Sequence, residues 1–322
     1  MTDFPDDELH TKPVTFMGAP YSHDLSSAKA AVLGVPFDCG VHPFRIGSRQ
    51  GPMAIRAQSS LVRRYNPELA DFDPLDRLGL VDRGDVRLTP SRITDAFARI
   101  ETAAKRIHDA GVIPVTMGGD GSVSLPLLSA AASRYAGMVA VHLDAHTDSY
   151  GYDPNDKYNA ATQFTHAAEE QCVVASLSYH IGIRGTTYVQ GAFEKTRSLG
   201  YNIITLRELF ARGFAEVLAE LRERLKGRPV YLCFDMDVFD PSCAPGVATP
   251  SWGGLSAREG IEFLRSLVGL DIIAVDVNTV SPPHDVQNMT AFLAAQVIYE
   301  SLVLLCQKPS RAPTLAALRA LC

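Results

Sequence analysis

Short apolar runs alternate with segments of helical periodicity along most of the chain. Apolar runs with few polar interruptions are typical of strands that are buried on both faces of a parallel sheet. Segments in which apolar residues recur every three or four positions are typical of helices that pack through one face. We therefore predict strands at 31–35, 112–117, 138–141, 179–183, 230–234 and 272–277, and helices after 52, at 91–108, 125–134 and 206–225, from 256 onward, and at 292–306.

The order of these elements indicates the fold class. A strand followed by a helix and another strand is typical of a parallel sheet, because parallel neighbours need a crossover connection. No change of composition marks a linker between 31 and 308. We predict a single three-layer α/β/α domain over 31–308 with a mainly parallel sheet, an irregular N-terminal arm at 1–30 and a C-terminal extension at 309–322. The extension is either a docking peptide or a frayed terminus.

Composition excludes several classes of protein. The 322 residues are 46% hydrophobic and 20% charged, with a net charge of -6, so we expect a globular chain that binds neither nucleic acid nor membranes. The six cysteines show no paired spacing and no export signal precedes the domain, which predicts reduced thiols and a cytoplasmic location. The apolar stretch 292–306 is interrupted by Gln296 and Glu300, so we do not expect it to insert into a membrane.

The stretch Val141–Asp148 carries most of the chemistry. In an extended chain, alternate side chains share a face, so His142, Asp144, His146 and Asp148 would all project to one side. An apolar strand precedes them, and open α/β sheets hold their sites where strands end. The stretch therefore predicts a group of metal ligands, although an Asp/His cluster in a solvated loop has the same composition.

Two further strand ends supply carboxylates or glycines. Asp235 and Asp237 follow one strand at alternate positions, and Gly118–Ser122 follows another. A set made of Asp144, His146, Asp148, Asp235 and Asp237 is rich in oxygen and holds one imidazole, which suits Mn²⁺ or Ni²⁺ better than a thiolate zinc site. Separate solvated loops that never meet are the alternative.

A series of motifs occurs in an order that resembles the ureohydrolase family of arginases and agmatinases. They are Gly34-Val-Pro-Phe-Asp-x-Gly, Arg45-x-Gly-x-Arg-x-Gly-Pro, Asp82-x-Gly-Asp-Val, Gly118-Gly-Asp, Asp144-Ala-His-Thr-Asp, Gly182-Ile-Arg-Gly, Phe234-Asp-x-Asp-x-x-Asp-Pro and Ala244-Pro-Gly. The resemblance covers about 32–300 and implies an eight-stranded parallel sheet, trimers or hexamers, and two metals bridged by hydroxide.

The resemblance also implies a role for each predicted ligand. Asp144 and Asp235 would bridge both metals. His146 and Asp237 would complete one metal position, and Asp148 with a further histidine would complete the other. The hydroxide would then attack a guanidinium carbon.

Three departures from the family pattern fall on the chemistry. Gly121 stands where the family has the further histidine, in Gly-Gly-Asp-His-Ser. Ala160, in Ala160-Ala-Thr-Gln-Phe164, stands where many members have the proton-transferring histidine of His-Gly-Thr-Pro-Phe. Thr279 precedes Val280-Ser-Pro-Pro where agmatinase-like members have a glutamate that holds the guanidinium.

Other histidines offer limited replacement for these losses. His142 lies deeper along the strand and is expected to be a core or supporting residue. We expect His166 and His180 to be structural, and His284 to approach the mouth of the pocket.

Three hypotheses follow. The first is a supporting, non-catalytic subunit that pairs with an active paralogue in a hetero-oligomer and holds one metal or none; two-component hydrolases of this family that act on guanidines and biguanides such as metformin are a precedent. The second is a self-sufficient, divergent agmatinase-like amidinohydrolase with an altered or mononuclear site, holding two metals if both positions work. The third is a binding or scaffold protein, which the retained carboxylates argue against because they would repel one another without a metal.

Overall fold

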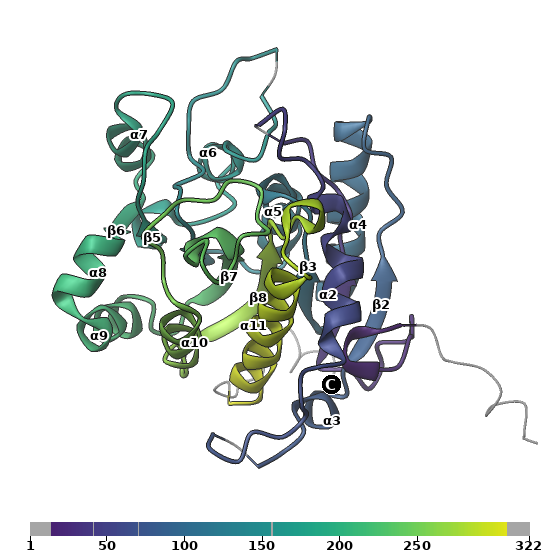
Figure 1. Ribbon diagram of the computed structural model, residues 1–322. Coiled ribbons are helices and arrows are strands. Elements are labelled where there is room, and N and C mark those ends of the chain that lie inside the picture. The colour runs from purple at the N-terminus through teal and green to yellow at the C-terminus, as the bar shows by residue number, and fades with distance from the viewer. Residues whose placement is uncertain (1–13, 41, 70, 156, 308–322) are drawn as a thin grey trace, which may run out of the picture.

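One sheet of eight parallel strands organises the protein, seen here in a computed structural model that describes residues 14–307 except 41, 70 and 156 (Figure 1). The strand order is β2-β1-β3-β8-β7-β4-β5-β6, and every pair of neighbours runs parallel. The bounds are β1 Ala30–Gly34, β2 Val81–Asp85, β3 Ile113–Met117, β4 Val139–Leu143, β5 Tyr179–Ile183, β6 Asn202–Thr205, β7 Pro229–Asp235 and β8 Asp271–Asn278.

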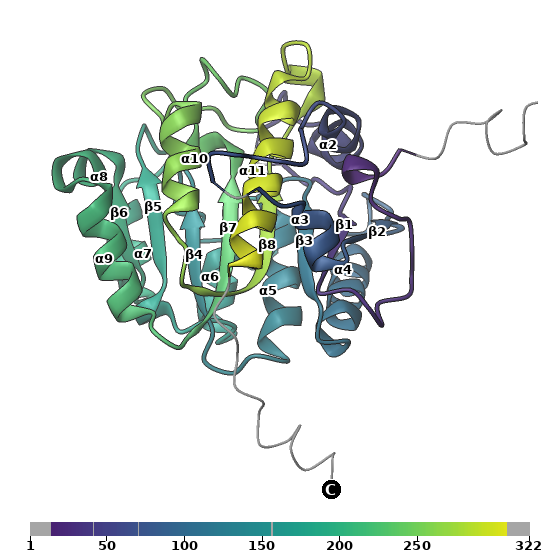
Figure 2. The ribbon, with the colours of Figure 1, turned by 90° about the horizontal axis from the view of Figure 1, so that it is seen from below.

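Helices cover both faces of this sheet, so the predicted three-layer α/β/α fold is confirmed. The helices are α2 Gly51–Ser59, α3 Pro74–Leu78, α4 Ile93–Asp109, α5 Ser124–Ala132, α6 Gln163–Glu169, α7 Ala192–Ser198, α8 Leu206–Arg212, α9 Phe214–Arg224, α10 Ala257–Arg265 and α11 Met289–Cys306. One hydrophobic core joins the sheet to α2, α3, α8, α9, α10 and α11, and a second joins it to α4, α5 and α6. Figure 2 shows α10 and α11 crossing one face of the sheet.

Alternation along the strands separates the two cores. On β4, Val139, Val141 and Leu143 enter the first core, whereas Ala140 enters the second. His142 therefore faces the α6 layer, where its ring lies 4.3 Å from that of Phe164. The strand thus places His142 on the face of the sheet that α4, α5 and α6 cover.

Six of the eight strands lie within two residues of their predicted positions, and the two strands that sequence analysis missed, β2 and β6, are the edges of the sheet. Edge strands are short and partly solvated, so they lack the continuous apolar run that marks a buried strand. The prediction of one helix over 206–225 is wrong, because the chain breaks at Gly213 into α8 and α9. Gly213 has φ 79° and ψ 151°, a conformation that glycine tolerates and other residues avoid.

The long helix α11 is apolar enough to cross a membrane by length and composition, but 72% of its most apolar stretch is buried inside the protein. It packs against α2, α3, α10 and β8. Burial of this extent is typical of a core helix. The predicted extension at 309–322 lies outside the described residues, and the domain boundaries remain predictions.

Asp82, on the edge strand β2, joins three parts of the chain. Its buried carboxylate accepts a hydrogen bond from the backbone of Phe16 (2.8 Å) and two from the guanidinium of Arg56 on α2 (2.8 and 3.0 Å). Arg56 also pairs with Asp85. The described part of the predicted N-terminal arm is therefore held against the body of the protein.

Replacing Arg56 with methionine tests this connection. Arg56→Met leaves the buried Asp82 carboxylate without its cation, so we expect the free energy of unfolding to fall by about 3–5 kcal/mol. The exposed pair of Arg99 with Asp95 on α4 is the control, and Arg99→Met should cost less than about 1 kcal/mol. Urea denaturation of both variants at pH 7 measures the difference; equal losses would contradict the role given to Asp82.

Candidate metal centre

The predicted site residues come from four neighbouring strands in the middle of the sheet. The order β3-β8-β7-β4 brings four carboxyl ends together. β3 leads to Gly118–Ser122, β4 to Asp144, β7 ends at Asp235, and β8 leads to Thr279. Parallel strands therefore gather at one edge the residues that the sequence keeps far apart.

Asp144, His146 and Asp237 form the first possible metal-binding group, called here the His146 group. Nδ1 of His146 lies 3.2 Å from Oδ1 of Asp144 and 3.1 Å from Oδ2 of Asp237. Backbone N–H groups orient both carboxylates: that of His146 donates to Asp144 (2.5 Å) and that of Ala145 donates to Asp237 (3.0 Å).

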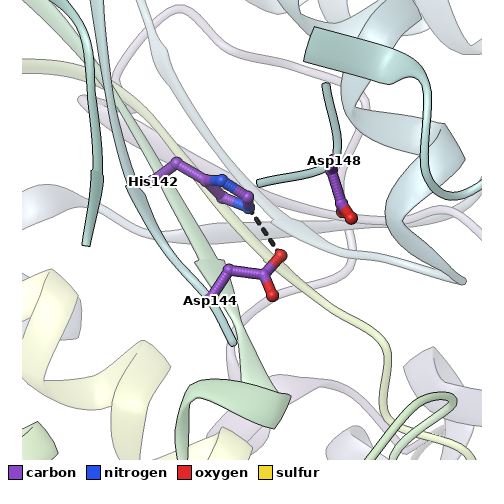
Figure 3. Close-up of side chains that lie close together, drawn as sticks. All are labelled: His142, Asp144 and Asp148. Carbon is purple, nitrogen blue, oxygen red and sulfur yellow. Dashed lines mark ion pairs between the residues drawn. The ribbon is translucent and has the colours of Figure 1, made fainter. Parts of the chain in front are cut away.

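His142, Asp144 and Asp148 form a second group, called here the Asp148 group (Figure 3). Nε2 of His142 lies 2.9 Å from Oδ2 of Asp144 (Figure 3). The two atoms are close but do not form a hydrogen bond of acceptable geometry. This buried oxygen therefore has no hydrogen-bond donor among the described residues. An oxygen of Asp144 is thus left free to bind a cation.

The predicted alternation of ligands on one strand face stops earlier than expected. β4 ends at Leu143, and Asp148 has a left-handed backbone with φ 47°. His146 and Asp148 reach the site through bends, and not through the pleat of a strand. The side chains of His142, His146 and Asp148 nevertheless gather around Asp144.

Asp235 and Thr279 meet beside these groups. The Thr279 hydroxyl donates to Oδ1 of Asp235 at 2.5 Å, and the backbone of Asp237 donates to the same oxygen at 2.8 Å. Thr279 has φ 67°, which is unusual for a β-branched residue. Its backbone N–H donates to the carbonyl of Gly119 (2.7 Å), so the chain around it holds the strained residue in place.

Burial and the neighbouring charges perturb the acidity of every carboxylate in the site. Desolvation raises the pKa of Asp144 to about 7, and desolvation with neighbouring carboxylates raises the pKa of Asp148 and of Asp235 well above the ordinary range. Burial alone would also raise the pKa of Asp237, but the charge and hydrogen bond of His146 lower it to about 2. Burial favours neutral His146, yet Asp237 and Asp144 raise its pKa well above 6.5.

These observations decide which residues fit a divalent cation. In the His146 group, two buried carboxylates with strongly shifted pKa values and an imidazole nitrogen within reach of both suit Mn²⁺ or Ni²⁺. Bound there, such an ion would supply activation of water. The space beside Asp148 fits less well. The histidine that the family pattern has at 121 is replaced by Gly121, and the remaining imidazole of the Asp148 group, His142, lies on β4 and is engaged with His180.

Gln163 occupies that space, and sequence analysis did not identify it as a site residue. Its Nε2 donates to Oδ2 of Asp148 at 2.5 Å. A Cβ atom built on Gly121 would lie 2.7 Å from the same nitrogen and 3.2 Å from the carboxylate. The sequence held one signal for this residue. In Ala160-Ala-Thr-Gln-Phe164, Gln163 stands where the family pattern His-Gly-Thr-Pro-Phe has proline, and Ala160 stands where that pattern has histidine.

A pocket of about 420 Å³ opens onto the site. The predicted residues Gly121, His146, Asp148, Ala160, Asp235, Asp237 and Thr279 all line it. His284 is not among the lining residues, and its expected approach to the pocket mouth stays a prediction. A larger, mostly apolar hollow lies beside α10 and α11 and contains none of the predicted site residues.

Three other histidines have structural surroundings. His142 and His180 are buried and lie 2.9 Å apart through their Nδ1 atoms, and burial lowers the pKa of His142 to about 4. His166 packs against Tyr152 and lies 2.9 Å from the carbonyl of Lys157. His142 is the one among them that also approaches a predicted ligand.

Several residues of the sequence motifs hold the loops of the pocket in place. Asp120 accepts hydrogen bonds from the backbones of Cys39 and Gly40 (2.8 and 2.7 Å), which fixes the loop after β1. Arg45 donates to the carbonyl of Val247 (2.7 Å), and Arg184 donates to that of Ser251 (2.8 Å). The loop framework is therefore intact around an altered site.

The fold and the site define an α/β protein with a central parallel sheet, whose strand ends gather buried carboxylates and an imidazole into a possible metal-binding group. The model of the Arginase family matches residues 28–304, and the chain belongs to that family. It is 36% identical to the guanidinobutyrase of Pseudomonas aeruginosa over 88% of each chain. It is 34% identical to the mitochondrial agmatinase of Gallus gallus, over 94% of this chain and 89% of that protein.

A solved structure supports the same assignment. The proclavaminate amidino hydrolase of Streptomyces clavuligerus superposes with a TM-score of 0.88 at 31% identity, over 92% of this chain and 98% of that one. The eight-stranded parallel sheet implied by the sequence resemblance is thereby confirmed.

Metal binding to the His146 group is expected to stabilise the protein. After treatment with a chelator, Mn²⁺ or Ni²⁺ at about a hundred times its Kd should add about 2.7 kcal/mol to the free energy of unfolding. Asp237→Asn should remove most of this increment, because it takes one carboxylate from the group. Asp95→Asn, at an exposed position on α4, is the matched control. Calorimetry with and without metal measures the increments, and an unchanged increment in Asp237→Asn would contradict the assignment.

Proposed function

We propose that the chain is the supporting subunit of an arginase-family hydrolase that cleaves a C–N bond of a guanidino or biguanide compound, paired with an active paralogue in a trimer- or hexamer-type assembly. Membership of the Arginase family and the similarity to guanidino hydrolases support the class of reaction. The observation that carries the supporting role is the neutral Gln163 amide, bonded to Asp148 above Gly121. The metal position beside Asp148 thus lacks the histidine that the family pattern has at 121, and the Gln163 amide stands next to it.

Two further positions support reduced catalysis in the isolated chain. Ala160 lines the pocket with a methyl group that can neither accept nor donate a proton. Thr279 lines it with a hydroxyl that is already bonded to Asp235. Neither residue offers a guanidinium the charged, bidentate contact of a carboxylate.

The pocket lining favours a substrate with an uncharged tail. Outside the carboxylates and His146 of the site, the described lining residues are neutral, including Thr187, Tyr188, Thr249 and Ser251, and none is lysine or arginine. The relatives named guanidinobutyrase and guanidinopropionase take their names from guanidino acids, whose carboxylate would lack a cationic partner in this pocket. A guanidine or biguanide without a carboxylate, as in metformin, fits the lining better.

A self-sufficient, divergent agmatinase-like enzyme is the second possibility. The intact His146 group favours it, because a single metal held by Asp144, His146 and Asp237 next to an open pocket would still supply activation of water. In this alternative the site holds a single metal ion. The absence of a histidine at 121 then goes with a mechanism that uses one ion in place of two.

Expression with and without a partner separates the two. The partner should be a paralogue that retains Gly-Gly-Asp-His and His-Gly-Thr, and the substrates should include agmatine, 4-guanidinobutyrate and metformin. The chain has Ala160 in place of the family's proton-transferring histidine, so the kcat/KM of the isolated chain should be at least about 100-fold below that of the co-purified complex. Subunit stoichiometry by native mass spectrometry provides the assembly control. Robust turnover by the chain alone would overturn the supporting role and favour the second function.

A further inference from the structure

Gln163 and Gly121 are in contact, and their geometry limits which side chains can stand at either position. The Gln163 side chain is buried, with 2% of the residue exposed, and its Nε2 lies 2.5 Å from the Asp148 carboxylate. The same nitrogen lies 2.7 Å from where a Cβ of residue 121 would stand. Real Cβ atoms do not approach other heavy atoms that closely, so glycine at 121 makes room for glutamine at 163.

The contact also replaces part of what a cation would do for Asp148. A buried carboxylate needs a positive charge or a hydrogen-bond donor, and the amide supplies a donor. Oε1 of Gln163 has no donor among the described residues, so the bond to Asp148 is the one polar contact that the structure gives this amide. The carboxylate therefore holds the amide in the position that a second metal would need.

We propose that Gln163 closes the second metal position, and that residues 121 and 163 form a coupled pair that sets how many metal ions the chain holds. The amide fills the space above Gly121 and occupies an oxygen of Asp148, which leaves the His146 group as the metal-binding position. A histidine at 121 enters this space only if the Gln163 amide gives up its bond to Asp148 and moves away. We therefore expect that restoring the histidine, with or without changes at 160 and 279, does not restore a second metal while glutamine remains at 163. The inference rests on the proposed metal role of the carboxylates and not on the partner subunit.

Three variants of the full chain test the coupling: Gly121→His, Gln163→Ala, and the two together. Gln58→Ala, at a half-buried glutamine on α2, is the matched control. Each protein is stripped with a chelator, equilibrated with Mn²⁺ and dialysed, and metal per chain is measured by elemental analysis. Electron paramagnetic resonance then reports whether two Mn²⁺ ions are magnetically coupled.

The expected results differ for each variant. The wild type and Gln58→Ala hold one Mn²⁺ per chain with an uncoupled spectrum. Gly121→His gains no second ion and melts at a lower temperature, because its Cβ meets the amide. Gln163→Ala removes the amide from the space above Gly121 but adds no imidazole at 121, so it does not bind a second ion tightly. The double variant holds two coupled ions, the second bound at least about tenfold more tightly than in either single variant.

Three results would overturn the inference. A second ion in Gly121→His alone would mean that Gln163 does not close the position. Two ions in the wild type, reduced to one in Gln163→Ala, would make the amide oxygen a ligand. A folded double variant without a second ion would remove the coupling. Because these readouts need no catalysis, the partner hypothesis can fail in the activity assay while the metal counts support the coupled pair.

Discussion

The burial of four carboxylates at one edge of the sheet is the constraint on which the rest of the site depends. Asp144, Asp148, Asp235 and Asp237 are nearly inaccessible to water, and like charges at such distances raise one another's pKa values. One imidazole, His146, offsets part of this repulsion through its contacts with two of them. The remaining compensation comes from backbone N–H groups, from the Thr279 hydroxyl and from the Gln163 amide.

The parallel sheet makes such crowding possible because it fixes where strand ends point. The four strands that supply the site are consecutive in the sheet but distant in sequence. The loops above them are tied by motif residues, with Asp120 holding the loop after β1 and Arg184 holding the backbone at Ser251. These residues shape the pocket without touching the chemistry, which explains how the family's framework can persist around altered ligand positions.

The sequence was sufficient to predict the buried centre of the fold and the residues that gather there. Central strands bury both faces and leave a continuous apolar signal, whereas the edge strands β2 and β6 do not. Asp144, Asp235 and Asp237 were found because they follow such strands directly. The bends that bring in Asp148, with its left-handed backbone, and the contact between residues 121 and 163 depend on tertiary packing, and neither leaves a periodic signal in the sequence.

The altered positions share one physical property. Where the family pattern has the histidine of one metal position, this chain has Gly121 and a Gln163 amide that donates to Asp148. Where agmatinase-like members have a glutamate, it has a Thr279 hydroxyl that donates to Asp235. In both places a neutral hydrogen-bond donor faces a buried carboxylate. At Thr279, the negative charge of the glutamate in the family pattern is also absent. Random loss of catalytic groups would leave buried carboxylates without partners at a cost of about 1–3 kcal/mol or more for each. The observed pattern instead places a hydrogen-bond donor on Asp148 and on Asp235, which lowers the demand of these two carboxylates for a cation.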